Sequence, residues 1–211
     1  MLFGSYANAE AAKAAEAAVR SPANFNWTTI FLLAVVVVIY LNEWKQKNYK
    51  GIAAALALYS VHWMYEIGNA LICHFTGYAL WTVSAASSSF ILLVGVSVEL
   101  SLMFSIAGFT SKLLPEDAKM KIMGINNRVV YAVGAALFAA ILEIFLAWTP
   151  AFIWVYPWWG AIPVFITTYI PFFLVSYKVY DKPPKSQKRI ILTLVAINIV
   201  LLAVLVPLGI I

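Results

Sequence analysis

Long hydrophobic runs separated by short polar segments dominate the sequence. Six of these runs are long enough to cross a bilayer, because a transmembrane helix needs about 20 predominantly apolar residues. None shows the alternation of polar and apolar positions that is typical of transmembrane β-strands. We therefore predict an all-α bundle of six membrane-spanning helices, at residues 26–44, 51–73, 79–110, 128–148, 158–180 and 188–211.

The segment before the first run has a different pattern. Residues 5–20 are rich in alanine, and their charged side chains recur about once per helical turn before Pro22. This predicts a short amphipathic helix, which lies either on the membrane surface or in solvent. The segment lacks the layout of a signal peptide. We accordingly divide the chain into an N-terminal region, residues 1–25, and one transmembrane domain, residues 26–211.

The composition agrees with a chain that faces lipid. Hydrophobic residues make up 64% of the sequence and charged residues 11%, with a mean hydropathy of +0.89. A soluble domain of this size could not bury so much apolar surface. This excludes a disordered chain and a water-soluble enzyme. The single cysteine, Cys73, also excludes a disulfide-stabilised scaffold.

The basic residues predict the orientation of the bundle. Twelve of the 14 lie in residues 45–50, 112–128 and 178–189, which alternate with connections that hold none. Short loops rich in Lys and Arg stay in the cytoplasm. We therefore expect both ends of the chain outside, and these three segments on the cytoplasmic side of a prokaryotic cytoplasmic membrane. The net charge of +5 then reflects orientation and contact with membrane lipids, not nucleic acid.

Three of the nine acidic residues fall well inside predicted spans, away from the span ends and the basic loops: Glu66, Glu99 and Glu143. An ionisable group in a membrane is costly, so it normally faces the bundle interior and marks a functional site. The three residues lie on consecutive antiparallel spans and at similar expected depths. We therefore predict that their carboxyl groups line a shared pocket.

One face of the second predicted span carries several of the reactive side chains. At about 100° per residue, positions 62, 66, 69 and 73 fall within about 40° of one another. We predict His62, Glu66, Glu99 and Glu143 as the acid/base groups. The predicted substrate-binding residues are the aromatic, amide and thioether side chains around them: Tyr59, Trp63, Tyr65, Asn69, Trp81 and Met103.

Such a site is suited to proton transfer. An acid that protonates an alkene, with a base that removes a proton elsewhere, would isomerise, cyclise or hydrate a lipophilic substrate of sterol or isoprenoid type. Aromatic faces and carboxylates would stabilise a cationic intermediate. The sequence has no glycine-rich nucleotide loop and no nucleophile motif. We therefore expect a membrane-dissolved small molecule as the partner and no cofactor.

Two short motifs resemble the emopamil-binding (EXPERA) family of sterol isomerases. They are H-W-M-Y-E, with His62 and Glu66, and S-V-E, with Glu99. The resemblance covers the first five spans, and it implies that these three residues handle protons around a carbocation-like sterol intermediate. The family's Asn and Trp of the fifth span have no match in residues 158–180, and this chain adds a sixth span.

Three other functions remain open at the level of sequence. Intramembrane Glu and His chains form proton relays, and Pro163 and Pro171 would kink the fifth span, as in a proton-coupled transporter or a proton-conducting protein. The acid/base residues could instead hold a metal ion: His62, Glu66, Glu99 and Glu143, with His74 as a further ligand. The polar groups could also be buried in a homo-oligomer or in a larger membrane complex.

Overall fold

The computed structural model describes residues 2–5, 8–84 and 86–211, and most of them form helices. Four helical segments are long and apolar enough to cross a membrane: Trp27–Lys45 (α2), Asn127–Ala147 (α5), Ala161–Tyr180 and Pro184–Leu205 (α8). Ala161–Tyr180 consists of α6 (Ala161–Val164), a π-helical stretch, η4 (Phe165–Tyr169), and α7 (Ile170–Tyr180). Their outward faces carry exposed apolar side chains, among them Phe31, Phe145 and Val200.

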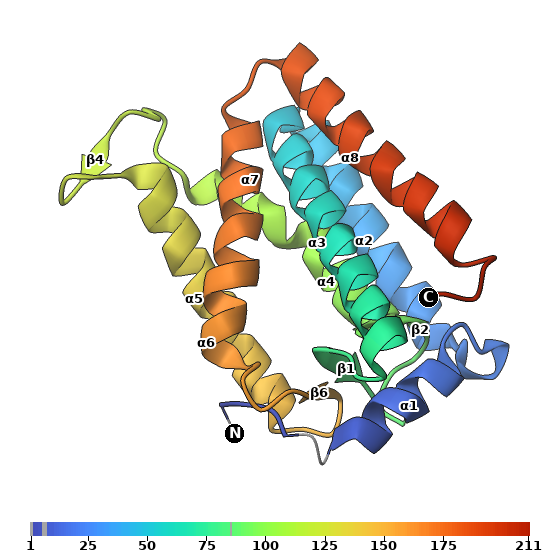
Figure 1. Ribbon diagram of the computed structural model, residues 1–211. Helices are drawn as coiled ribbons and strands as arrows, with labels where there is room; N and C mark the ends of the chain where they lie inside the picture. Colours follow the sequence, from blue (N-terminus) through green and yellow to red (C-terminus); the bar gives the residue numbers. More distant parts are fainter. Residues whose placement is uncertain (1, 6–7, 85) are drawn as a thin grey trace.

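The helix α3 (Tyr49–Thr76) is the longest, and it lies among the others. It packs against α2, α7 and α8 and against the short helix α4 (Val98–Ala107) (Figure 1). Its polar row lowers its hydropathy, which explains why it is not among the four apolar helices. The neighbouring helices cover that row. The second predicted span is therefore helical, and it forms the centre of the structure.

The predicted third helix, residues 79–110, does not form. This segment holds three strands, β1 (Trp81–Val83), β2 (Ile91–Leu93) and β3 (Val96–Ser97), before α4 and the 3-10 helix η3 (Gly108–Leu113). Gly77, with φ 76°, ends α3, and the serine-rich run 84–89 does not favour a helix. With 10 residues, α4 is about 15 Å long, too short to cross a bilayer.

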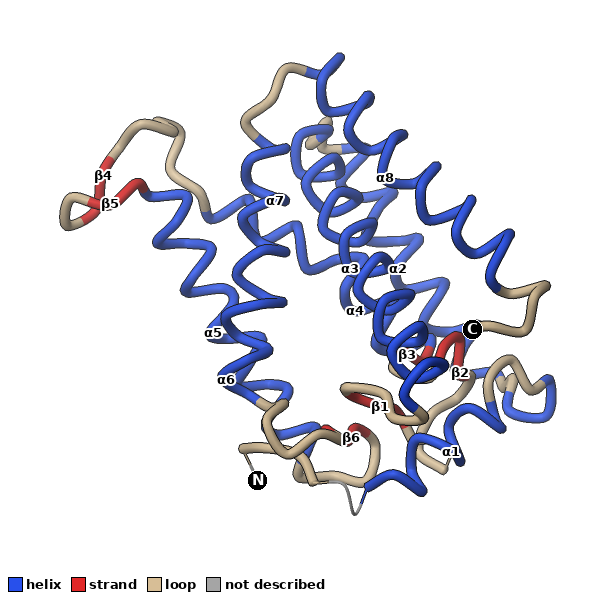
Figure 2. The backbone as a smooth tube through the Cα atoms, viewed as in Figure 1, coloured by secondary structure: helices blue, strands red, loops and turns tan. Residues whose placement is uncertain are grey.

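The strands form a small layer at one end of the helices. β1 pairs antiparallel with β6 (Phe152–Trp154), with Trp81 opposite Trp154, and β2 pairs with β3. This pairing satisfies part of the strand backbone within the protein, as the interior of a membrane protein requires. Figure 2 shows the strands close to α1 and to the end of α8. The all-α prediction is thus correct for the long elements and wrong for this end layer.

The N-terminal helix is shorter than predicted and packs on the strand layer. α1 (Ala9–Ala18) lies against β1 and β2, and Ala12 and Ala15 are fully buried there. The turn η2 (Pro22–Asn24) follows it. Residues 6 and 7 of the predicted helix lie outside the described residues. The sequence predicted that this helix lies on the membrane surface or in solvent, but its alanine face packs against the strand layer.

The basic connections lie at the end of the molecule opposite α1 (Figure 1). They include the hairpin of β4 (Lys121–Ile122) and β5 (Ile125–Asn126), which extends beyond the helices. At this end the buried Glu43 of α2 accepts a hydrogen bond from Lys112 of η3 at 2.5 Å. The alternation of basic and neutral connections seen in the sequence is thus an alternation between the two ends of the bundle.

A substitution at Gly108 tests the contact between η3 and α3. A Cβ atom at Gly108 would lie 2.4 Å from Ala55 Cα and 2.7 Å from Ala54 O, both backbone atoms. We expect Gly108→Ala to lower the free energy of unfolding in detergent by about 1–3 kcal/mol, since the two elements must separate. Gly134→Ala on α5 is the control, because nothing lies within 4 Å of its added methyl group. Equal stability of the two variants would contradict this packing.

Candidate functional site

A cavity of about 320 Å³ lies between α3, α4, α5 and the η4–α7 segment. Most of its wall is apolar, and aromatic rings such as Phe104, Phe172 and Phe173 contribute much of it. Polar side chains gather near the strand layer. They are His62, Tyr65, Glu66, Trp81, Glu143, Thr168 and Tyr169, whereas the remaining polar residue of the wall, Thr110, belongs to η3. Three of the four predicted acid/base residues therefore line one cavity.

The α3 face is buried as predicted, but its members have different tasks. His62, Glu66, Asn69 and Cys73 are all at most 4% exposed. His62 and Glu66 line the cavity, whereas Asn69 holds β1 in place. Its Nδ2 donates to Trp81 O at 2.9 Å, and its Oδ1 accepts from Leu80 N at 2.8 Å. Asn69 is therefore a positioning residue and does not line the cavity.

The carboxyl group of Glu66 has a ring nitrogen beside each of its oxygens, from the His62 imidazole and from the Trp81 indole. The His62 Nε2 atom lies 3.3 Å from Oε1, and Trp81 Nε1 donates to Oε2 at 3.3 Å. Gly95 makes room for this arrangement, since a Cβ atom there would lie 2.5 Å from Trp81 Nε1 and 2.7 Å from Glu66 Oε2. The carboxyl group is thus fixed in direction by its neighbours on α3 and β1.

Glu143 of α5 has a matching arrangement. Trp154 Nε1 donates to its Oε1 at 2.6 Å, and the Tyr169 hydroxyl donates to its Oε2. Trp81 and Trp154 are directly opposite each other in the β1–β6 register. One cross-strand pair of indoles therefore orients both carboxyl groups at the same end of the cavity. The β1–β6 pair is the element that assembles the site.

The π-helical stretch η4 supplies the last part of the polar end. Pro171 has no N–H for the carbonyl of Thr167, four residues earlier, and the Tyr65 hydroxyl donates to that oxygen instead, at 2.8 Å. The wider π turn brings Thr168 and Tyr169 to the cavity. The sequence predicted a kink at this proline; the structure has a π turn beside it, and this turn places two hydroxyl groups in the site.

Several polar atoms of the cavity have no hydrogen-bond partner within the described chain. Both ring nitrogens of His62 and the hydroxyl of Thr168 are buried without a hydrogen bond, and the 3.3 Å contact of Nε2 with Glu66 Oε1 does not have hydrogen-bond geometry. The His62 ring stacks on Phe104, with centroids 4.2 Å apart. Buried polar atoms are usually satisfied, so these atoms are available to a bound molecule or to water. They give the cavity a set of polar contacts next to its apolar walls.

Glu99 lies away from this group. Its Oε1 accepts from Ser89 N at 2.6 Å, and it is not part of the cavity wall. Burial alone would raise the pKa of this carboxyl, but hydrogen bonds, first from Ser89 and also from Ser97 and its own backbone, outweigh burial and hold the pKa below its usual value. Glu99 thus anchors the loop before β2. The sequence could not show this, because it depends on α4 being short.

The separation of Glu99 also affects the metal hypothesis. Among the described residues, no three His, Cys, Asp or Glu side chains come close enough to hold one metal ion. His74, proposed as a further ligand, is exposed near the C-terminal end of α3 beside Phe75. The predicted ligand set is therefore not assembled in this structure.

The predicted substrate-binding residues divide into two groups. Tyr65, Trp81 and Met103 line the cavity. Asn69, as above, does not, and neither do Tyr59 and Trp63. The Tyr59 hydroxyl lies 2.8 Å from Ser101 Oγ and joins α3 to α4, and Trp63 packs beside Ile67.

Sequence reasoning missed four contributors: Gly95, Trp154, Thr168 and Tyr169. Their roles depend on strand pairing and on the π turn. The only available signal was the clustering of Trp and Tyr near residues 154–169.

Comparison with known proteins identifies the family and corrects one prediction. A family model described as an uncharacterized membrane protein family matches residues 9–207. An uncharacterized protein of Archaeoglobus fulgidus is 42% identical over 200 residues, which cover 92% of this chain and 95% of the relative. No solved structure matches the chain.

The resemblance to the EXPERA sterol isomerases is therefore wrong, since the match over nearly the whole chain is to a different family. The motif that suggested it, H-x-x-x-E, arises on any helix that places a His and a Glu one turn apart. The H-W-M-Y-E residues face a cavity here, but they carry no family signal. The chain is an integral membrane protein, and it belongs to the uncharacterized membrane protein family whose model matches residues 9–207.

Proposed function

We propose that this protein binds a lipophilic small molecule from the bilayer in its cavity and performs acid/base chemistry on it. The observation that carries the proposal is the polar end of the cavity. His62, Glu66 and Glu143 line that end of a largely apolar space, and neither His62 nitrogen makes a hydrogen bond within the described chain, although Nε2 lies 3.3 Å from Glu66 Oε1. A merely structural network would be expected to satisfy its buried polar atoms.

The chemistry that fits these groups is proton transfer to and from carbon. One group donates a proton to a carbon of a C=C bond, which leaves a cation on the neighbouring carbon. A second group then removes a proton from an adjacent carbon, so the double bond moves and no net proton is consumed. The apolar wall excludes most water, which favours isomerisation or cyclisation over hydration. The rings of Phe104, Tyr169 and Phe172 would stabilise the cation.

The substrate would enter sideways from the lipid. Met103 of α4 and Phe138 and Leu142 of α5 line the cavity, and all three are partly exposed on the outer surface. In contrast, α3 packs against α4 and α7, and α5 packs against α7. The seam between α4 and α5 is therefore the open one. A molecule dissolved in the membrane could reach Glu66 and Glu143 through it without crossing water.

Filling the cavity tests whether it holds a lipophilic molecule. Ala139 of α5 lines it, and we expect Ala139→Trp to reduce the amount of co-purified lipophile about tenfold or more, because overpacking costs about 1–3 kcal/mol. Leu137→Trp is the control, since Leu137 is 51% exposed and is not part of the wall. The measurement is mass spectrometry of the organic extract from protein in nanodiscs. Equal occupancy in the two variants would refute binding at this site.

Proton-coupled transport and a role as a subunit of a complex are the alternatives. Proton flux into liposomes that is lost on Glu66→Gln, with no chemical change in any lipophile, would favour transport over catalysis. We further propose that the basic connections face the cytoplasm, as the distribution of Lys and Arg suggests. Labelling of a cysteine placed at Lys182 from the outside of intact cells would contradict that orientation.

A further inference from the structure

The β4–β5 hairpin has features that the cavity does not explain. Two residues, Met123 and Gly124, connect its strands, with φ of 50° and 82°. A two-residue hairpin turn of this kind needs positive φ at both positions, which Asn-Gly or Gly-Gly adopts most easily. Met123 is instead a large apolar residue in a left-handed conformation, and it is 97% exposed. Strain of this kind points to a function for the side chain.

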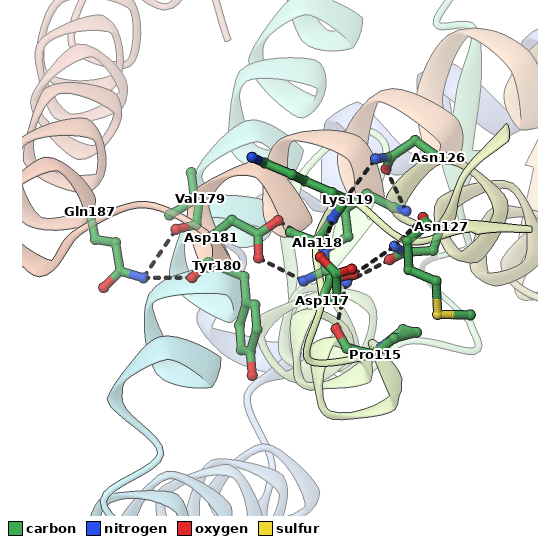
Figure 3. Close-up of polar contacts among 12 residues, drawn as sticks. Pro115, Asp117, Ala118, Lys119, Asn126, Asn127, Val179, Tyr180, Asp181 and Gln187 are labelled. Atoms are coloured by element: carbon green, nitrogen blue, oxygen red, sulfur yellow. Dashed lines mark hydrogen bonds and ion pairs between the residues drawn. The ribbon is translucent and has the colours of Figure 1, made fainter.

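The base of the hairpin is firmly attached to the helices. Asn127 Nδ2 donates to Met120 O and to Asp117 O, and Asn126 Nδ2 donates to Ala118 O (Figure 3). Arg128 follows directly, and it forms two hydrogen bonds of 2.8 Å with Asp181 at the end of α7. The exposed tip is therefore carried by an ordered base and has a defined position relative to α5 and α7.

The surface of the hairpin combines apolar and basic groups. Met120, Met123 and Ile125 are 43%, 97% and 52% exposed, and the exposed Lys119 and Lys121 flank them. Residues 119–126 include no acid. The hairpin joins the first residue of α5, an apolar helix of 21 residues, and so lies where that helix would meet the membrane surface (Figure 1). Apolar side chains flanked by lysines match the boundary between anionic headgroups and acyl chains.

We propose that the β4–β5 hairpin is an anchor that inserts Met123 into the anionic headgroup region of the membrane, with Lys119 and Lys121 on lipid phosphates. The anchor would fix the position of α5. This helix packs on α7 and η4, and its other side lines the mouth of the cavity. A fixed tip would hold this wall of the cavity at a constant tilt. The inference is independent of the chemistry proposed for the cavity.

The test places an environment-sensitive fluorophore on the tip. Cys73 is buried and is the single cysteine, so Met123→Cys in a Cys73→Ala background gives one label, and Glu116→Cys in the same loop gives the matched control. In nanodiscs of phosphatidylcholine and phosphatidylglycerol, we expect a blue shift at position 123. We also expect quenching by nitroxide-labelled lipid about twofold or more above that at position 116. The substitutions Lys119→Gln and Lys121→Gln together should reduce this difference, as should phosphatidylcholine alone.

Two results would overturn the proposal. One is a label at position 123 that reports water and shows no more quenching than position 116 in either lipid mixture. The other is a blue shift that requires a second copy of the chain, seen in concentrated micelles and absent from nanodiscs that hold one copy. The unlabelled variants are checked for folding by tryptophan fluorescence, so loss of structure is distinguished from loss of contact.

Discussion

Glu143→Gln is expected to slow proton transfer to a bound lipophile about 100-fold or more, the usual contribution of a positioned acid or base. The amide cannot give or take the proton at neutral pH. It does retain one oxygen, which can still accept from Trp154 Nε1 or from the Tyr169 hydroxyl. Glu and Gln are also nearly equal in volume. We therefore expect the substitution to reduce the rate of proton transfer and to leave the fold intact.

The measurement works with a substrate of any identity. Protein in nanodiscs made with a lipid extract of the host membrane is incubated in heavy water, and the extracted lipophiles are examined by mass spectrometry for deuterium bound to carbon. Glu99→Gln is the matched control, because Glu99 is a carboxylate outside the cavity. The proposed chemistry would be refuted if nanodiscs with the wild-type protein incorporate no more deuterium than nanodiscs without protein. An equal loss of deuterium incorporation in Glu143→Gln and Glu99→Gln would refute the assignment of Glu143.

Arg128→Ala is expected to lower the free energy of unfolding by about 1–3 kcal/mol, the usual cost of leaving hydrogen-bonding groups without their partner. The Arg128 side chain is 9% exposed and forms two hydrogen bonds with Asp181. It also donates to Pro115 O at 2.8 Å. The substitution would leave the carboxylate and this carbonyl without their donor. It would also detach the start of α5 from the end of α7.

Thermal unfolding in detergent, followed by circular dichroism, gives the comparison. Arg128→Lys should recover only part of the stability, since an ammonium group cannot pair with both carboxylate oxygens in the same geometry. Arg189→Ala is the control, because Arg189 is an exposed residue of α8 and such changes usually stay within about 0.5 kcal/mol. In the double variant with Asp181→Ala, the loss should be smaller than the sum of the two single losses. Full additivity would show that the pair is not coupled.

Sequence reasoning identified the α3 face because a helix has a fixed period. His62 and Glu66 are one turn apart, so their shared direction follows from backbone geometry alone, and burial of both was confirmed. Glu143 was found for a different reason, since an isolated acid in an apolar run must face the interior of the bundle. The same reasoning placed Glu99 in the site, and there the prediction required a helix through residues 79–110 that does not form.

The sequence alone determined that the chain contacts lipid and that its long apolar segments are helices. The excess of apolar residues requires lipid contact, and four of the six predicted spans are long apolar helices in the structure. What only the tertiary structure decided is which groups meet. Trp81 and Trp154 are 73 positions apart and become neighbours through the β1–β6 register, and Tyr169 reaches Glu143 through a π turn. Such contacts depend on pairing between distant segments, and no local period encodes them.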